Sequence, residues 1–452
     1  MNKQVVKRTV LSAGAWTIGG FVLSQILRFG GNLLLTRLLM PEYFGIMGIV
    51  TVVIVGLTMF SDLGLLQSVV QSRKGETSEY LNTAWTIQII RGVVLGLLMI
   101  LIAAGIQLGI DQDVLRNEMV YGNPLLPSVL LVLSIVPVLN GFESSKLFLA
   151  NRKLDLKPIT IIEVSSQFIG LCLMVLLALY SPTIWSLVSG VIVSAMLKTI
   201  FSHIFLKGEK NVFLLERQSV KDIISYGKWV LLGSISGFLL SQGDRLLLGG
   251  LIDAKSLGVY TIAYFLASAV LLGFARLNRT VFFPALSEVA REQNSRLKEY
   301  YYRIRAKTDI LIFLVAGTLF MTGQSIIDLL YDERYTDAGW MLEILAVSVL
   351  GVASVVAEQI FLATGNSKWM SLTSIAQLLF LYVGVPTAHL LWGLHGAVWV
   401  IALAFVPKYL ISLFFLKRLE VFSLVKEVRF FPLIIIGLGI GFIVNRLLMM
   451  ML

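Results

Sequence analysis

Long apolar segments follow one another along almost the whole chain, and short polar or charged turns separate them. Most are longer than the roughly 20 residues that a helix needs to cross the hydrocarbon core of a bilayer. We therefore predict an all-α polytopic membrane protein with about thirteen spans. Their approximate cores are 12–39, 42–72, 79–110, 124–149, 157–180, 182–206, 225–252, 256–287, 301–330, 336–364, 368–391, 393–416 and 430–451.

The two halves of this pattern repeat each other at an offset of 213 residues. The matching positions are Ser12 and Ser225, Gly14 and Gly227, Trp16 and Trp229, Gly20 and Gly233, Leu33–Leu35 and Leu246–Leu248, Gly45 and Gly258, and Phe148–Ala150 and Phe361–Ala363. Duplicated halves built of apolar helices are typical of transporters, whose central site lies between two lobes. We expect two homologous helical-bundle lobes of about six spans each, at 1–207 and 225–418. A cytoplasmic linker over 208–224 joins them, and an extra span lies in 419–452.

Composition supports the membrane class. With 57% hydrophobic and 14% charged residues and a mean hydropathy of +0.85, the 452-residue chain cannot bury its apolar surface in one soluble core. The single cysteine, Cys172, lies within a span and excludes a disulfide framework, and the three histidines lack the carboxylate and thiolate neighbours of a metal site. The first apolar stretch is too long for a signal peptide and leads directly into another span, so we expect it to be retained.

Basic residues occur in alternate turns and orient the spans. If the N-terminus is cytoplasmic, each basic turn is also cytoplasmic, as the positive-inside rule requires. These turns carry Arg73/Lys74, Arg152/Lys153/Lys157, Lys207/Lys210/Arg217/Lys221, Arg291/Arg296/Lys298/Arg303/Arg305/Lys307 and Lys417/Arg418/Lys426/Arg429. The net charge of +10 therefore reflects topology, and we expect no nucleic-acid partner.

Two segments interrupt the apolar pattern. Val212 to Ile224 mixes apolar and charged residues in a way that suits an amphipathic helix on the inner surface. Pro284 to Arg305 carries a charged string, which predicts either a solvated helix or a moving connection between gates.

Charged residues inside the spans are the candidate functional residues, because each costs roughly 2.5–3.5 kcal/mol at a helix centre. Arg28 lies near the middle of the first span, with Gln25 and Asn32 one turn away on either side. It is expected to line a polar cavity or to cap backbone carbonyls of a neighbouring helix. Arg276 and Arg279 share a face of span eight, and two guanidinium groups suit a diphosphate. The alternative for this pair is snorkelling to the inner surface.

Arg91, Lys198 and Lys408 are weaker members of this substrate-binding set, and snorkelling is the default explanation for the two lysines. Among the acidic residues, Asp62, Asp244 and Glu358 are candidates for gate ion pairs or ion coupling. Asp244 and Arg245 point about 100° apart on a helix, so each is expected to need a partner from another helix. Nothing in the sequence ranks the remaining acids, which are Glu143, Glu163, Asp309 and Glu343.

Several motifs are similar to those of a known family. Arg37-Leu38-Leu39-Met40-Pro41-Glu42-Tyr43-Phe44-Gly45 and Phe60-Ser61-Asp62-Leu63-Gly64-Leu65 resemble the opening of the Wzx-type polysaccharide-exporting flippases. These belong to the multidrug/oligosaccharidyl-lipid/polysaccharide (MOP) superfamily. Phe283-Pro284-Ala285-Leu286-Ser287 and Leu362-Ala363-Thr364-Gly365-Asn366-Ser367-Lys368 are similar to motifs of its second lobe. Members usually have twelve or fourteen spans, so a count of thirteen departs from the family and would fit a missing final helix.

The resemblance implies alternating-access translocation of undecaprenyl-diphosphate-linked oligosaccharide from the inner to the outer leaflet of the bacterial inner membrane. It implies a transporter rather than an enzyme, without a cofactor, that uses a Na⁺ or H⁺ gradient or the membrane potential. Arginines on spans one and eight would hold the diphosphate, with membrane lipids and polysaccharide polymerase or assembly proteins as further partners. A drug/cation antiporter of the same superfamily remains the alternative, and a carboxylate-dominated cavity would favour it. A membrane glycosyltransferase would need outer-side catalytic residues. The only outer motif that resembles an acid pair is Asp111-Gln112-Asp113, and its short, acidic loop is interpreted as topology.

Overall fold

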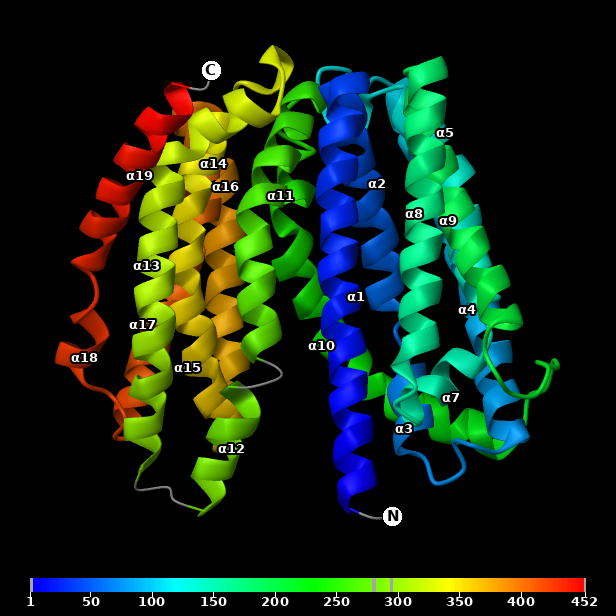
Figure 1. Cartoon of the computed structure of the whole chain (residues 1–452). Coiled ribbons are helices and arrows are strands. Elements are labelled where there is room, and N and C mark those ends of the chain that lie inside the picture. Colours follow the sequence, from blue (N-terminus) through cyan, green and yellow to red (C-terminus); the bar gives the residue numbers. More distant parts are fainter. Residues whose placement is uncertain (1–2, 279–281, 293–295, 451–452) are drawn as a thin grey trace. The chain divides into compact units, whose positions relative to one another are not determined.

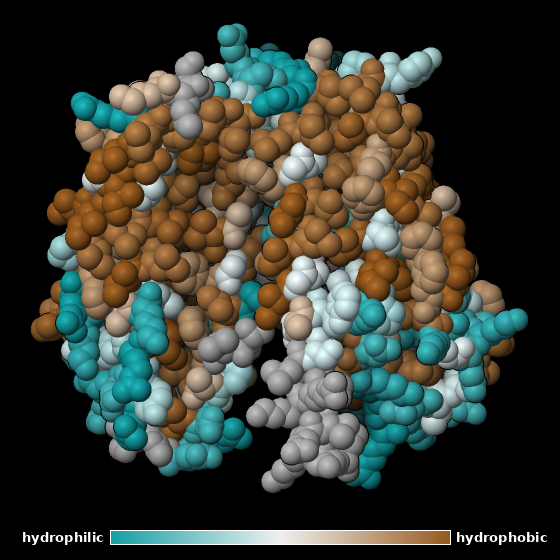
Figure 2. Space-filling model, viewed as in Figure 1, coloured by the Kyte–Doolittle hydropathy of each residue, from teal (hydrophilic) through white to brown (hydrophobic). Residues whose placement is uncertain are grey.

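The structure is a computed structural model that describes residues 3–278, 282–292 and 296–450. Every element in these ranges is a helix, so the predicted all-α fold class is confirmed (Figure 1). Contacts divide the chain into two compact units, Met1–Phe238 and Leu239–Leu452. On the face that Figure 2 shows, apolar residues form a broad band and hydrophilic residues gather above and below it. This is the surface expected of helices that cross a membrane.

The first unit contains nine helices, three-residue helix η1 and the first part of α10. The bounds are α1 Lys3–Leu38, α2 Pro41–Phe60, α3 Leu65–Gln71, α4 Ser78–Asp111, η1 Val120–Gly122, α5 Leu125–Leu133, α6 Ile135–Gly141, α7 Lys146–Arg152, α8 Leu156–Tyr180, α9 Ile184–Ile204 and α10 Arg217–Leu248. Small residues let these helices approach closely. A Cβ on Gly92 of α4 would lie 2.5 Å from the carbonyl oxygen of Pro137 in α6, so the two backbones touch there.

In its described residues, the second unit contains the end of α10, nine further helices and two 3-10 turns. The bounds are α11 Ala254–Leu277, α12 Phe283–Glu292, α13 Leu297–Leu330, η4 Glu333–Tyr335, α14 Ala338–Ala346, η5 Val347–Gly351, α15 Val352–Ala363, α16 Ser367–Leu403, α17 Phe405–Arg418, α18 Leu424–Val428 and α19 Leu433–Met449. The additional C-terminal helix α19 packs along α13, where a Cβ on Gly437 would lie 2.8 Å from the carbonyl oxygen of Leu314.

Ten described helical segments are long and apolar enough to cross a membrane, or eleven if α5–α6 and α7, bent by 58°, form one broken span. The predicted count of thirteen is higher for two reasons. One segment, Ser367–Arg418, is divided at Gly393, whose φ of 63° and ψ of −154° are not helical. A Cβ on Gly384 would lie 2.8 Å from Val400, so the chain folds back on itself there. The other reason is α10, which is helical over the predicted seventh span but is not among the ten.

The linker differs from its prediction. An amphipathic helix was expected over Val212–Ile224, but the helix begins only at Arg217. Residues 212–216 instead run across α4, and the backbone N–H groups of residues 212, 214 and 216 each donate at 3.0 Å to the side chains of Asn82, Thr86 and Thr83, respectively. These acceptors replace the carbonyl partners that a helix would supply, which explains the extended start.

The start of α10 also belongs to the first unit. Ile223 is fully buried in a cluster with Leu65, Val69 and Tyr80. The boundary between the compact units lies at Phe238, within α10, so both the linker and the beginning of the seventh predicted span fall in the first unit. The predicted domain limits at 207, 224 and 418 stay predictions.

Candidate functional site

Arg28 lies on an exposed polar strip of α1. Its Nη1 donates to Oε1 of Gln25 at 3.3 Å, and Asn32 lies one turn further along the same face. The segment Ser12–Leu38 is long and apolar enough on average to cross a membrane, and Arg28 lies near its centre. An exposed guanidinium at this depth is costly in hydrocarbon, so the strip is suited to a water-filled or anion-containing space.

Asp62 lies in a break between α2 and α3, where the sequence predicted a continuous span. Gly64 has a φ of 58°, a left-handed conformation that favours glycine, and its N–H donates to Oδ1 of Asp62 at 2.9 Å. Arg91 of α4 holds the end of α2. Its Nη2 donates to the Thr58 carbonyl at 2.6 Å and its Nε to Oγ of Ser61 at 2.9 Å, and it interacts electrostatically with Asp62. Arg91 thus satisfies groups that the helix end leaves without partners.

Lys198 of α9 pairs with Glu143 at 2.9 Å. Glu143 lies in the bend between α6 and α7 and is only 12% exposed, whereas Lys198 is 34% exposed. The predicted cation therefore binds a carboxylate that the sequence could not rank, and the ion pair fastens the bend to α9.

A cavity of about 300 Å³ lies within the second unit. Its polar lining consists of Asp244, Tyr264, Asn278, Ser348, Ser354, Gln377 and Lys408. Asn278 follows the end of α11 and is 3% exposed, yet neither polar atom of its amide has a hydrogen-bond partner among the described residues. Since buried polar groups are almost always paired, this amide is available to a water molecule or a ligand in the cavity.

The two charged neighbours Asp244 and Arg245 both find partners on α11. Asp244 is buried and accepts a hydrogen bond from the Tyr260 hydroxyl at 2.6 Å. The Arg245 guanidinium lies 4.6 Å from the centre of the Tyr264 ring. Asp244 thus faces the cavity with one of its oxygens held by a neutral donor.

Lys408 and Glu358, predicted for different roles, form one ion pair at the cavity. Their Nζ and Oε2 atoms are 3.0 Å apart, and the side chains are 12% and 7% exposed. Thr373 donates to the other carboxylate oxygen of Glu358 at 2.8 Å. Removing one partner of such a buried ion pair destabilises the fold, because the other charge then stays buried without compensation.

The predicted arginine pair on span eight is only partly described. Arg276 is half-buried in the last turn of α11, which ends at Leu277. Arg279 lies outside the described residues. The cavity therefore unites Asp244 and Lys408, with Glu358 bound to Lys408, whereas Arg28, Arg91, Asp62 and Lys198 belong to the first unit.

A second charged cluster was missed by the sequence analysis. Arg305 ends the charged segment for which a solvated helix or a moving connection between gates was predicted, but its side chain is 2% exposed in α13. Its Nε lies 3.1 Å from Oδ1 of Asp309, its Nη2 lies 3.2 Å from Oε2 of Glu427, and its Nη1 donates to the Ala353 carbonyl at 2.9 Å. Four segments, α13, α15, α17 and α18, meet at this guanidinium, because Tyr409 also lies within 3.5 Å of it.

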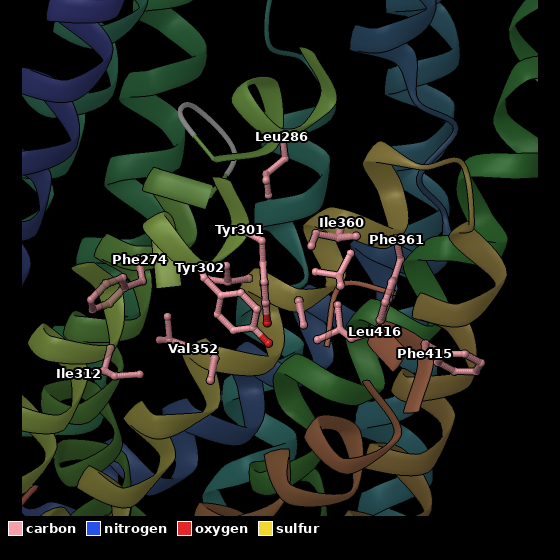
Figure 3. Packing of buried hydrophobic residues seen from close by; sticks show 14 of the residues in the cluster. Phe274, Leu286, Tyr301, Tyr302, Ile312, Val352, Ile360, Phe361, Phe415 and Leu416 are labelled. Atoms are coloured by element: carbon pink, nitrogen blue, oxygen red, sulfur yellow. The ribbon is translucent and has the colours of Figure 1, made fainter. Parts of the chain in front are cut away.

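Tyrosine hydroxyls complete the cluster. Glu427 accepts hydrogen bonds from Tyr409 at 2.6 Å and from Tyr302 at 2.9 Å. The hydroxyl groups of Tyr301 and Tyr302 point to the same side within the buried apolar core (Figure 3). The spacing of Arg305 and Asp309, one helical turn apart and next to a tyrosine pair, is the sequence signal that could have revealed part of this cluster.

Comparison with known proteins agrees with this architecture. The model of a family described as "Polysaccharide biosynthesis protein" matches residues 34–340. The lipopolysaccharide biosynthesis protein WzxC of Escherichia coli (strain K12) is 22% identical over 343 residues, covering 76% of this chain and 67% of that protein. The teichuronic acid biosynthesis protein TuaB of Bacillus subtilis (strain 168) is 22% identical over 357 residues, covering 78% and 70%, respectively.

Solved structures show the same fold. An inward-facing multidrug resistance MATE family transporter of the MOP superfamily aligns with a TM-score of 0.66 at 16% identity, covering 88% of this chain and 96% of that one. The lipid II flippase MurJ in an inward closed conformation aligns with a TM-score of 0.64 at 15% identity, covering 97% and 98%. The resemblance drawn from the motifs is confirmed: the chain belongs to the polysaccharide biosynthesis protein family and is a multi-pass membrane protein with the fold of the MOP-superfamily transporters.

Proposed function

We propose that this protein is a flippase that moves undecaprenyl-diphosphate-linked oligosaccharide repeat units from the inner to the outer leaflet by alternating access. Membership of a polysaccharide biosynthesis family supports a lipid-linked glycan as the cargo. The fold shared with MATE transporters and with MurJ supports transport rather than catalysis. Assembly of a cell-surface polysaccharide is the process that such a movement would serve.

The observation that carries the proposal is a buried amide in a cavity of the second unit that polar side chains partly line. The second unit encloses the Asn278 amide, which has no hydrogen-bond partner among the described residues, in a cavity that Lys408 and Gln377 also line. Amides and ammonium groups bind sugar hydroxyls and anionic sugars, whereas a scaffold has no use for them at this depth. We assign contacts with the glycan to this cavity.

We assign contacts with the diphosphate to Arg28 and Arg276, one cation from each unit. Arg28 is exposed on α1, and Arg276 lies at the end of α11, half-buried. A guanidinium meets a phosphate with paired hydrogen bonds, which makes arginine well suited to this headgroup. The adjoining Arg279 belongs to the same proposal. Arg91 and Lys198 are held by protein groups, which favours structural roles for both.

We place the coupling and gating roles on acids. Asp244 faces the cavity and would bind a coupling cation or proton, driven by a Na⁺ or H⁺ gradient or by the membrane potential. The Lys408–Glu358 ion pair would open when an anionic substrate competes for Lys408. Asp62, beside the break between α2 and α3, would act at a gate.

We propose the bacterial inner membrane as the location, with a cytoplasmic N-terminus, because the basic turns alternate as the positive-inside rule requires. Polysaccharide polymerase and assembly proteins are the expected partners on the outer side.

A deletion strain tests this function. Without the protein, lipid-linked oligosaccharide should accumulate on the cytoplasmic leaflet, and wild type should relieve the accumulation. Arg28→Ala and Arg276→Ala should not relieve it, because each removes a phosphate contact. Lys153→Ala, which removes an exposed loop cation, is the matched control and should behave as wild type.

The outcomes separate the parts of the proposal. If both arginine variants rescue the strain, the diphosphate contacts are wrongly assigned. If no lipid-linked glycan accumulates in the deletion strain, the flippase proposal fails and drug/cation efflux becomes the function to test.

A further inference from the structure

An apolar groove of about 690 Å³ lies between α1 and α8 in the first unit. Ala15, Gly19, Leu23 and Leu27 form its wall on α1 and recur every four residues, so they share one face of the helix. Trp16 lies at one end. A Cβ on Gly19 would meet nothing within 4 Å, so the groove is open at its middle.

The opposite wall is a stripe on α8 that includes Ile161, Val164 and Phe168. Two hydroxyl groups also occur there, but both are satisfied within α8: Thr160 donates to the Leu156 carbonyl at 2.9 Å and Ser165 to that of Ile162 at 3.3 Å. The described part of this wall therefore offers an occupant an apolar surface, because both of its hydroxyl groups already donate within α8.

One end of the groove carries a cation. Lys157 lies one turn before Ile161 on the same stripe of α8, is exposed, and places Nζ 5.4 Å from the centre of the Trp16 ring. No ion pair joins Lys157 to a carboxylate of the described residues. The basic turns predict that this end lies at the cytoplasmic face of the membrane.

We propose that the groove binds an anionic phospholipid of the cytoplasmic leaflet, with its phosphate at Lys157 and one acyl chain along α1 and α8. From Ala15 to Leu27 the groove extends about 18 Å along the helix, which is close to half of the roughly 30 Å hydrocarbon core. A chain that starts at the interface and ends near the bilayer centre has this length. The site would stand even if the protein carried another substrate.

The helix geometry distinguishes this lipid from the transported one. Arg28 lies about 160° around α1 from the centre of the wall that Ala15, Gly19, Leu23 and Leu27 form. The line where Gly20 and Gly31 bring α1 against α8 runs between them. A lipid in the groove therefore has its phosphate at the interface and not at the Arg28 strip. Lys157 and the groove form a complete amphiphile site by themselves.

Tryptophan quenching tests the site. The protein is placed in phosphatidylcholine nanodiscs that contain a small fraction of phosphatidylglycerol or phosphatidylcholine with a dibrominated acyl chain. The Trp16 signal is taken as the difference between each protein and its Trp16→Phe counterpart. We expect brominated phosphatidylglycerol to quench Trp16 at about fivefold lower concentration than brominated phosphatidylcholine, since one cation near the surface favours an anionic lipid to about that degree.

Two pairs of variants supply the controls. Lys157→Gln should remove the preference for phosphatidylglycerol, whereas Lys153→Gln, an exposed loop lysine outside the stripe, should keep it. Gly19→Leu should fill the groove and reduce quenching by both lipids, whereas Gly105→Leu, at an equally open glycine on α4, should not.

Three results would overturn the proposal. Equal quenching of Trp16 by the two lipids in the wild-type protein would mean that Trp16 contacts only the surrounding bilayer lipid, without selectivity. Unchanged quenching in Gly19→Leu would mean that the chain lies elsewhere. Relief of the phosphatidylglycerol quenching by an equimolar amount of polyprenyl phosphate would assign the groove to the transported lipid instead.

Discussion

Replacement of Glu427 by glutamine should destabilise the second unit strongly, because it breaks one side of a buried ion pair. Arg305 and Glu427 are 2% and 3% exposed and 3.2 Å apart. Removing one partner of such a pair typically costs about 3–5 kcal/mol, since the other charge stays buried. In the variant, Arg305 keeps its ion pair with Asp309 and its hydrogen bond to the Ala353 carbonyl, and the glutamine amide still offers one acceptor oxygen. We therefore expect a loss at the lower end, about 3 kcal/mol.

The assay is thermal unfolding of the purified protein in detergent, followed by size-exclusion chromatography of the fraction that stays folded. Glu299→Gln is the matched control: Glu299 is 52% exposed and pairs with Arg303 at 2.9 Å, so its loss should cost at most about 0.5 kcal/mol. Tyr409→Phe removes one donor to Glu427 and should cost about 1 kcal/mol. Equal unfolding midpoints for Glu427→Gln and Glu299→Gln would refute the argument that the cluster fastens α18 to α13.

Three further predictions concern backbone and cap geometry. Gly393→Ala should lower the free energy of unfolding by about 1–3 kcal/mol in the same assay, because a φ of 63° with a ψ of −154° is open only to glycine. An unchanged unfolding midpoint would contradict the helix break at Gly393. Gly92→Leu should prevent folding, seen as loss of the monodisperse peak, because its Cβ would meet the Pro137 carbonyl oxygen at 2.5 Å; Gly105→Leu should keep that peak. Asp253 caps α11, and although burial alone would raise its pKa, hydrogen bonds from the Ser256 N–H at 3.0 Å and hydroxyl at 2.7 Å hold that pKa below its usual value. A carboxyl group whose pKa is lower in the folded than in the unfolded state stabilises the fold at pH values above the unfolded pKa. Asp253→Ala should therefore lower the free energy of unfolding by about 1 kcal/mol near neutrality, and this loss should shrink as the pH falls toward the folded pKa. A loss of stability that does not change with pH would contradict the prediction.

Much of the fold could be predicted from the sequence because apolar length alone defines a membrane helix. The predicted core 157–180 corresponds to α8 at Leu156–Tyr180, and 368–391 and 393–416 to the two arms on either side of Gly393. Helix breaks were harder. The helix break at Asp62 and Gly64 lies within an apolar run that predicts one continuous span. Hydrogen bonds from Arg91, which lies on another helix, stabilise this break.

Side-chain partners depend on contacts that are remote along the chain. Lys408 and Glu358 could each be named as charges in a span, but nothing local indicates that they pair. Arg305 lies at the end of a charged segment that favoured a solvated helix, and its partner Glu427 lies in a basic segment more than a hundred residues later. A single sequence shows which charges lie in the membrane, whereas the fold decides which of them are neutralised by the protein and which remain for a ligand.

The most direct test of the central claim is translocation by the purified protein. Proteoliposomes are loaded with undecaprenyl-diphosphate-linked oligosaccharide bearing a fluorescent sugar, and the fraction of label accessible to a membrane-impermeant quencher is followed under an imposed ion gradient or membrane potential. The account predicts that the accessible fraction changes with time in liposomes that contain the wild-type protein. With Arg28→Ala this change should be at least tenfold slower, which corresponds to an increase of about 1.4 kcal/mol in the activation free energy. Translocation at the rate of protein-free liposomes under every gradient would contradict it.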